Sequence, residues 1–69
     1  LYPNPASTEL RIQASKQIEQ VEIWDLKGKK ILENTNSIIS VNQLPNGLYL
    51  VKINLEGSEF QMRKLIIAR

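Results

Sequence analysis

The stretch that decides the fold is Leu48-Tyr49-Leu50-Val51-Lys52-Ile53-Asn54-Leu55, which contains neither proline nor glycine. All of its odd-numbered positions are apolar or aromatic, whereas the even-numbered positions include the polar residues Lys52 and Asn54. Because side chains alternate between the two faces of a strand, this period of two predicts a β-strand that buries its odd-numbered face. It is the longest β signal in the chain.

Turn signals bracket this strand on both sides. Before it, residues 44–47 read Leu-Pro-Asn-Gly, in which Pro45 presets φ and Gly47 supplies a left-handed position. After it, the sequence Glu-Gly-Ser at 56–58 turns the chain again. The sequence therefore predicts that the central strand pairs with a neighbour across each short turn.

The last apolar segment, residues 59–68, is predicted to be a strand with an irregularity. Phe60 and Met62 fall on one parity, whereas Leu65 and Ile67 fall on the other. This switch predicts either a bulge or burial on both faces. We expect Tyr49 and Phe60 to belong to the core, because so small a sandwich needs most of its aromatic residues for packing.

A hairpin is predicted in the first half of the chain. Val21 and Ile23 alternate with polar residues and precede Asp-Leu-Lys-Gly at 25–28, where Gly28 can take the positive φ of a tight turn. The return strand is expected over residues 29–33, with Ile31 as its surest inward residue.

The segment before this hairpin is ambiguous by periodicity, since Leu10 and Ala14 fit either a strand or a helical face. No capping box supports a helix, so a strand from residue 9 followed by a turn over 15–19 is favoured. A further short strand is expected over 38–41. Six strand candidates joined by short turns predict an all-β, antiparallel β-sandwich.

Length and composition restrict the function classes. The chain has 69 residues, no cysteine, no histidine and a formal net charge of +2. This length fits one domain, because at about 60 residues a chain buries only about 60% of its unfolded surface. Without cysteine or histidine, the usual zinc sites and His-assisted nucleophilic catalysis are excluded. We expect no enzyme activity, no cofactor, no metal, no small-molecule substrate and, given the low net charge, no nucleic-acid partner.

Two small basic clusters and one tryptophan leave alternatives open. Lys27, Lys29 and Lys30 gather at the predicted hairpin turn, and Arg63, Lys64 and Arg69 gather near the C-terminus. Solubilising, aggregation-resistant edges explain such clusters best. Trp24 has the opposite parity to Val21 and Ile23, so its place in the core is open.

Four sequence blocks in one order resemble a known family. They are Tyr2-Pro3-Asn4-Pro5-Ala6-Ser7, then residues 21–29, then 44–53, and finally Arg63-Lys64-Leu65-Ile66-Ile67. Together they resemble the C-terminal sorting domain, type A, of the type IX secretion system of Bacteroidetes-type bacteria. The family pattern more often closes with lysines, whereas this chain ends Ile67-Ala68-Arg69.

The resemblance implies a small immunoglobulin-like β-sandwich of about six or seven strands, at the C-terminus of a larger cargo protein. It implies that residues 1–69 form a single sorting domain, and the start at Leu1 fits a piece of a longer polypeptide. Translocon and shuttle proteins are the implied partners, together with a surface sortase-like cysteine protease. The implied route runs through the periplasm to the cell surface or the medium; the oligomeric state is left open.

The family motifs can be placed on this chain residue by residue. Those positions are Pro3, Asn4, Pro5, Gly28, Gly47, Tyr49, Lys64 and Leu65. The glycines are expected to permit turns, whereas Lys64, the exposed face around it and the carboxy-terminal end of the chain are the candidates for direct contact. The apolar last strand could also dock by strand addition at a sheet edge.

Two other functions fit an all-β domain of this composition. A carbohydrate-binding or adhesive module appended to a secreted enzyme would need coplanar, exposed aromatic side chains that include Trp24. A structural spacer would stabilise a neighbouring domain without changing the destination of the protein.

Overall fold

A computed structural model describes residues 8–69. Strands make up most of this part of the chain, and a single 3-10 turn, η1, separates the last two. The elements are β1 (Glu9–Arg11), β2 (Ile18–Trp24), β3 (Lys30–Asn34), β4 (Ile38–Ser40), β5 (Gly47–Leu55), η1 (Glu56–Ser58) and β6 (Glu59–Ile67). The motif residues Pro3, Asn4 and Pro5 lie outside the described residues.

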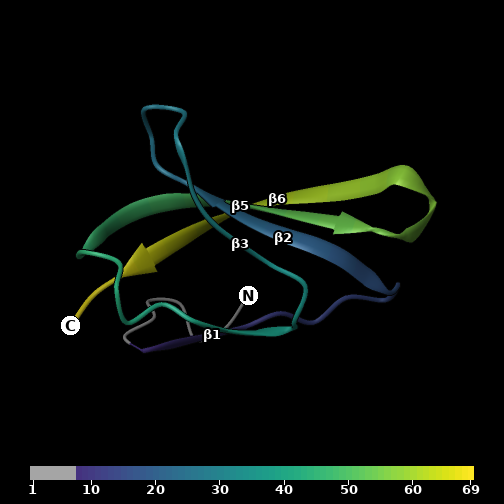
Figure 1. Ribbon diagram of the computed structural model, residues 1–69, viewed down its shortest axis with the longest axis horizontal. Helices are drawn as coiled ribbons and strands as arrows, with labels where there is room; N and C mark the ends of the chain where they lie inside the picture. The colour runs from purple at the N-terminus through teal and green to yellow at the C-terminus, as the bar shows by residue number, and fades with distance from the viewer. Residues whose placement is uncertain (1–7) are drawn as a thin grey trace.

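The strands form two antiparallel sheets. One has the order β3-β2-β5-β6, and the other pairs β1 with β4. In Figure 1, β1 runs beneath the four-stranded sheet, while the turn between β2 and β3 projects at the upper left and the β5–β6 hairpin extends to the right. The predicted all-β, antiparallel sandwich is confirmed.

The core lies between the two sheets and is built from alternating residues. Tyr49, Val51, Ile53 and Leu55 are all buried, which confirms the face predicted for the central strand. The rest of the core comes from both layers: Leu10, Ile12, Val21, Ile23, Ile39, Val41, Leu44, Leu65 and Ile67. Within residues 8–69 no polar or charged residue is buried, so packing of apolar side chains and strand pairing hold the sandwich together.

The prediction that Ile31 points inward is wrong, because β3 carries a bulge. The Cα partner of Ile23 is Leu32, whereas the next residue, Trp24, is paired with Lys30. Ile31 is thus the extra residue on β3 and is 40% exposed. Leu32, one position later, packs against the core instead.

The prediction for β6 is also corrected. Its register with β5 is unbroken from Leu55 opposite Glu59 to Gly47 opposite Ile67, so β6 has no bulge against β5. Leu65 and Ile67 are buried, whereas Phe60 is 57% exposed and lies outside the core. Burial on both faces is therefore excluded, and the apolar residues of the other parity face outward.

Two turns differ from their predicted positions. The hydrogen-bonded turn before β5 runs from Val41 to Leu44, whose amide donates to the Val41 carbonyl at 3.1 Å. Gly47 is already the first residue of β5; its φ of 157° is positive and rarely adopted by residues with a side chain, but it is not the left-handed helical value that was predicted. The predicted turn over 15–19 is shorter, because β2 begins at Ile18.

Candidate functional site

The turn that contains Gly28 is organised by the side chain of Asp25. Its Oδ1 accepts hydrogen bonds from the backbone amides of Lys27 and Lys29, both at 2.9 Å. The Gly28 amide donates to the Asp25 carbonyl at 3.2 Å, and Gly28 has a φ of 89°. A Cβ at this position would meet no atom within 4 Å, so only its backbone conformation requires glycine.

Tyr49 and Leu65, which lie far apart in the sequence, are paired across β5 and β6 on the inner face. Leu65 is fully buried, and the Tyr49 ring is nearly so. The Tyr49 hydroxyl donates a hydrogen bond to the carbonyl of Pro45 at 2.6 Å. This contact ties the loop before β5 to the strand that follows it.

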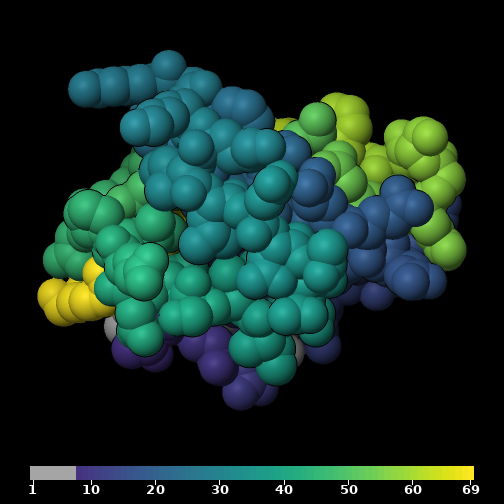
Figure 2. All heavy atoms as spheres, in the orientation of Figure 1, coloured from purple at the N-terminus to yellow at the C-terminus, as the bar shows by residue number. Residues whose placement is uncertain are grey.

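Arg69 holds the same loop from the other end of the chain. Its guanidinium donates to the carbonyls of Val41 and Leu44. In Figure 2 the C-terminal atoms, in yellow, lie against the green atoms at the lower left. A planar guanidinium can donate to two carbonyls at once in a fixed geometry. A lysine ammonium lacks this rigid arrangement of donors. The unusual arginine close of this chain therefore has a structural role.

Lys64 lies on the opposite face of the sheet from Leu65. It pairs with Leu50, and its neighbours of the same parity along β6 are Met62 and Ile66. We call this side of the β3-β2-β5-β6 sheet the outer face. Lys64 therefore lies between two exposed apolar side chains that are not among the predicted motif residues.

A hollow of about 320 Å³ opens at the outer face beside the Gly28 turn. It is lined by residues from β2, β5, β6 and that turn: Trp24, Asp25, Leu26, Gly28, Leu50, Lys52, Phe60 and Met62. Lys52 places its ammonium 4.8 Å from the centroid of the Phe60 ring, a cation–π contact. The indole Nε1 of Trp24 donates to the Glu22 carboxylate at 3.2 Å, which fixes the half-buried ring at the edge of the hollow.

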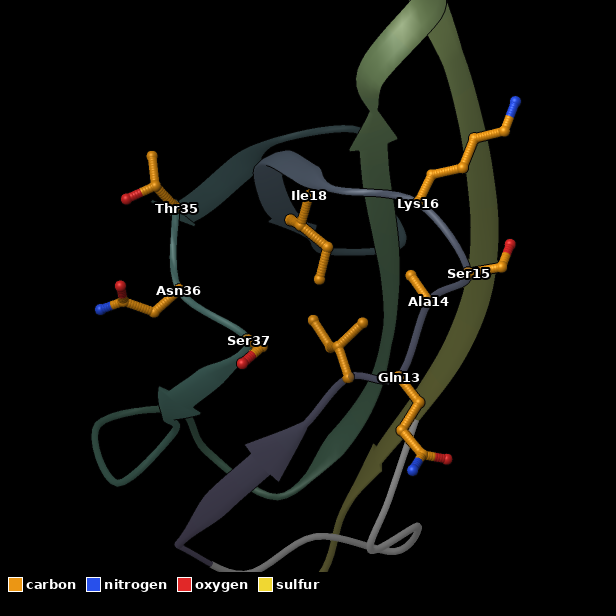
Figure 3. Close-up of a pocket in the computed structure, with 9 residues that line it drawn as sticks. Gln13, Ala14, Ser15, Lys16, Ile18, Thr35, Asn36 and Ser37 are labelled. Carbon is orange, nitrogen blue, oxygen red and sulfur yellow. The ribbon is translucent and has the colours of Figure 1, made fainter.

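A larger hollow of about 710 Å³ lies between residues 12–18 and 35–37. Figure 3 shows that Ile18 points into it, whereas the polar ends of Lys16, Thr35 and Asn36 point away. These three residues therefore direct no polar group into the hollow.

The family comparison agrees with the motifs placed on this sheet. The family model described as the secretion system C-terminal sorting domain matches residues 1–68. The chain belongs to this type IX sorting-domain family. No curated protein matches the chain in sequence. Among residues 8–69, no helix of the sorting domain is long and apolar enough to cross a membrane.

The structure separates the predicted motif residues of the sorting domain by location. Tyr49 and Leu65 meet in the core, Gly47 begins β5 beside them, Gly28 borders the outer hollow, and Lys64 lies on the outer face. The exposed apolar side chains on the outer face of β5 and β6 were not predicted from the sequence. Counting residues from Leu55 and Glu59 across η1 would have placed Phe60 and Met62 on the polar side of β5, away from the core.

Proposed function

We propose that this domain is a folded secretion signal that directs a cargo protein across the outer membrane through the type IX system. Residues 1–69 serve as the C-terminal domain of a larger polypeptide that reaches the periplasm first. Translocon and shuttle proteins then recognise the domain, and a surface cysteine protease removes it. The cargo ends at the cell surface or in the medium.

The observation that carries this proposal is the family match over residues 1–68. The fold is compatible with it, since a sandwich without buried polar groups among residues 8–69 can present a stable surface to other proteins. In this proposal the motif residues have two different roles. Gly28, Gly47, Tyr49 and Leu65 maintain the shape, and Lys64 belongs to the surface that is read.

The test places residues 1–69 behind a signal peptide and a fluorescent reporter. The fusion is expressed in a bacterium with a working type IX system and in a matched strain that lacks the translocon. We expect reporter fluorescence at the surface or in the medium of the first strain, and in the periplasm of the second.

Retention in both strains, with a folded domain by circular dichroism, would contradict the proposal. A reporter with a raised melting temperature but an unchanged destination would then support the structural spacer. Deleting residues 65–69 is a poor test, because Leu65 and Ile67 are buried and their loss would unfold the domain. Point substitutions on exposed positions separate recognition from folding.

A carbohydrate-binding function is the second candidate, because Trp24 and Phe60 line one hollow on the outer face. Aromatic rings on one surface are the feature that this function requires. The check is the fluorescence of Trp24, the sole tryptophan, during titration with soluble polysaccharides. A saturable change would favour sugar binding, whereas an unchanged spectrum would count against it.

A further inference from the structure

The two-stranded sheet leaves one edge of β4 open. The Val41 amide donates a hydrogen bond to the Thr8 carbonyl at 2.9 Å, which makes these two residues a hydrogen-bonded pair at the end of the β1–β4 ladder. Because such pairs alternate with non-hydrogen-bonded pairs, Ile38 and Ser40 direct their backbone groups away from β1. Within residues 8–69 no strand lies on that side of β4, so these backbone groups are unpaired there.

The open edge of β4 lacks charges, prolines and bulges, which commonly protect a free strand edge from pairing. On β1 the corresponding outward positions are the charged residues Glu9 and Arg11, and β3, another edge strand, carries the bulge at Ile31. By contrast, residues 37–41 read Ser-Ile-Ile-Ser-Val, and the register of β4 with β1 is unbroken. The β4 edge is therefore suited to pair with a further extended strand.

A hollow of about 300 Å³ opens beside this edge, between the two sheets. Its lining comes from β3, from the end of β4 and from the loop that follows, and none of it is charged: Ile31, Leu32, Ser40, Val41, Gln43 and Leu44. Alternate side chains of a strand point to opposite faces of its sheet. A strand added to β4 would therefore direct every second side chain toward the inner face, where the hollow lies.

We propose that the open edge of β4 and this hollow bind an extended, uncharged segment of a type IX protein by strand addition; this rests on the sorting function proposed above. The segment pairs its backbone with Ile38 and Ser40 and directs one bulky apolar side chain toward Leu32 and Leu44. The main-chain hydrogen bonds provide affinity, and the hollow selects the side chain. This edge belongs to the small sheet and is distinct from the edge formed by β6.

A second copy of the chain fits this site less well than a separate segment. Two β4 edges paired with each other would leave both hollows empty, because Ile39 of each copy already lies in its own core. The edges at β1 and β6 would bring charged side chains to an uncharged surface, among them Arg11 and Lys64. The edge at β3 is interrupted by its bulge.

The first test removes one outward amide from each edge of the same small sheet. Ser40→Pro takes a donor from the open edge, whereas Arg11→Pro takes one from the opposite edge; neither amide belongs to the β1–β4 ladder. We expect Ser40→Pro to lower the exported fraction of the reporter fusion about tenfold, and Arg11→Pro to leave it unchanged. Equal export from two variants that are folded by circular dichroism would overturn the proposal.

A second pair of variants fills the hollow and leaves the strand unchanged, so it decides the question if Ser40→Pro does not fold. Gln43→Trp places a bulky side chain at this hollow, and Gln13→Trp places the same side chain at the larger hollow elsewhere. We expect only Gln43→Trp to lower export. Equal export from both variants would contradict the role of the hollow.

A photo-crosslinking residue identifies the occupant. It replaces Gln43 in one fusion and Phe60, which is exposed on the outer face, in the control; crosslinked peptides are sequenced by mass spectrometry. We expect position 43 alone to crosslink to a type IX component, through a peptide without charged residues. Crosslinks only to a second copy, to the same chain, to the cargo or to nothing during active export would overturn the proposal.

A measurement on the purified chain keeps the site testable if the fusion is not exported, which would refute only the proposed function. The chain is mixed with a short peptide that alternates threonine and valine around a central leucine, or with its N-methylated counterpart, which lacks backbone donors. Hydrogen exchange followed by NMR reports on single amides. We expect only the unmethylated peptide to slow exchange at Ile38 and Ser40, with no change at Glu9 and Arg11. Equal protection of both edges, or of neither, would overturn the site.

Discussion

At the scale of single residues, the Tyr49 hydroxyl is a contact whose removal leaves packing intact. Tyr49→Phe keeps the buried ring but takes the donor from the Pro45 carbonyl, 2.6 Å away. We expect the free energy of unfolding to fall by about 0.5–1.5 kcal/mol, the usual net value of such a hydrogen bond. Urea unfolding followed by Trp24 fluorescence measures this. An unchanged midpoint would show that the carbonyl finds water instead.

The second prediction at this scale concerns Gly28, where only the backbone conformation requires glycine. Its φ of 89° is unfavourable for a residue with a Cβ, although the surrounding space is open. We expect Gly28→Val to cost about 1–3 kcal/mol, and Gly28→Asn less, because asparagine tolerates positive φ better. Calorimetric melting temperatures should rank wild type above Asn above Val. Equal values for Asn and Val would mean that the turn relaxes to another conformation.

At the scale of elements, β6 presents two faces with opposite consequences for substitution. Leu65 is fully buried opposite Tyr49, whereas Met62 on the outer face is exposed. Leu65→Ala should cost about 2–5 kcal/mol through lost burial and a cavity, a large share of the roughly 3–10 kcal/mol that stabilises a domain of this size. Met62→Ala should change the unfolding free energy by less than about 0.5 kcal/mol. Similar losses in the two variants would contradict the assignment of faces.

The same two strands show what the sequence could predict. The face of β5 follows from its strict alternation, and the Gly28 hairpin follows from the composition of its turn, so both were predicted. The prediction for Ile31 is wrong because a bulge changes which residues of β3 face inward, and no residue type in β3 indicates that bulge. The prediction for Phe60 is wrong because it relied on the tendency of aromatic residues to be buried. The register across η1 instead pairs Phe60 with Asn54 and so places it on the outer face.

At the scale of the whole molecule, pairing between distant segments sets the architecture. β1 and β4 form a separate layer in which Leu10 lies opposite Ile39, and no local pattern in either short strand indicates this partner. The candidate site has the same origin, because Trp24 and Phe60 line one hollow only after β2, β5 and β6 have assembled. Local motifs thus predicted the elements and the family, whereas the layers and the outer surface required the structure.

This dependence on assembly leads to a prediction that separates a folded signal from a linear one. Ile39 is 1% exposed, lies in the two-stranded sheet, and belongs to none of the sorting motifs or the outer face. Ile39→Asp buries an unpaired charge, which should unfold the domain. The amino-acid sequence of every motif is unchanged in this variant. If the machinery reads the assembled surface, export of the reporter fusion should be lost.

The matched control is Ile39→Val, which keeps the apolar character and should cost only about 0.5–1.5 kcal/mol. Export of this variant should remain near that of the unsubstituted fusion. Immunoblots of the periplasm must show both variants at comparable abundance, so that proteolysis is not mistaken for failed recognition. Efficient export of Ile39→Asp, with an unfolded circular dichroism spectrum, would instead show that the machinery reads a linear motif, and it would move the search for contacts to residues 63–67.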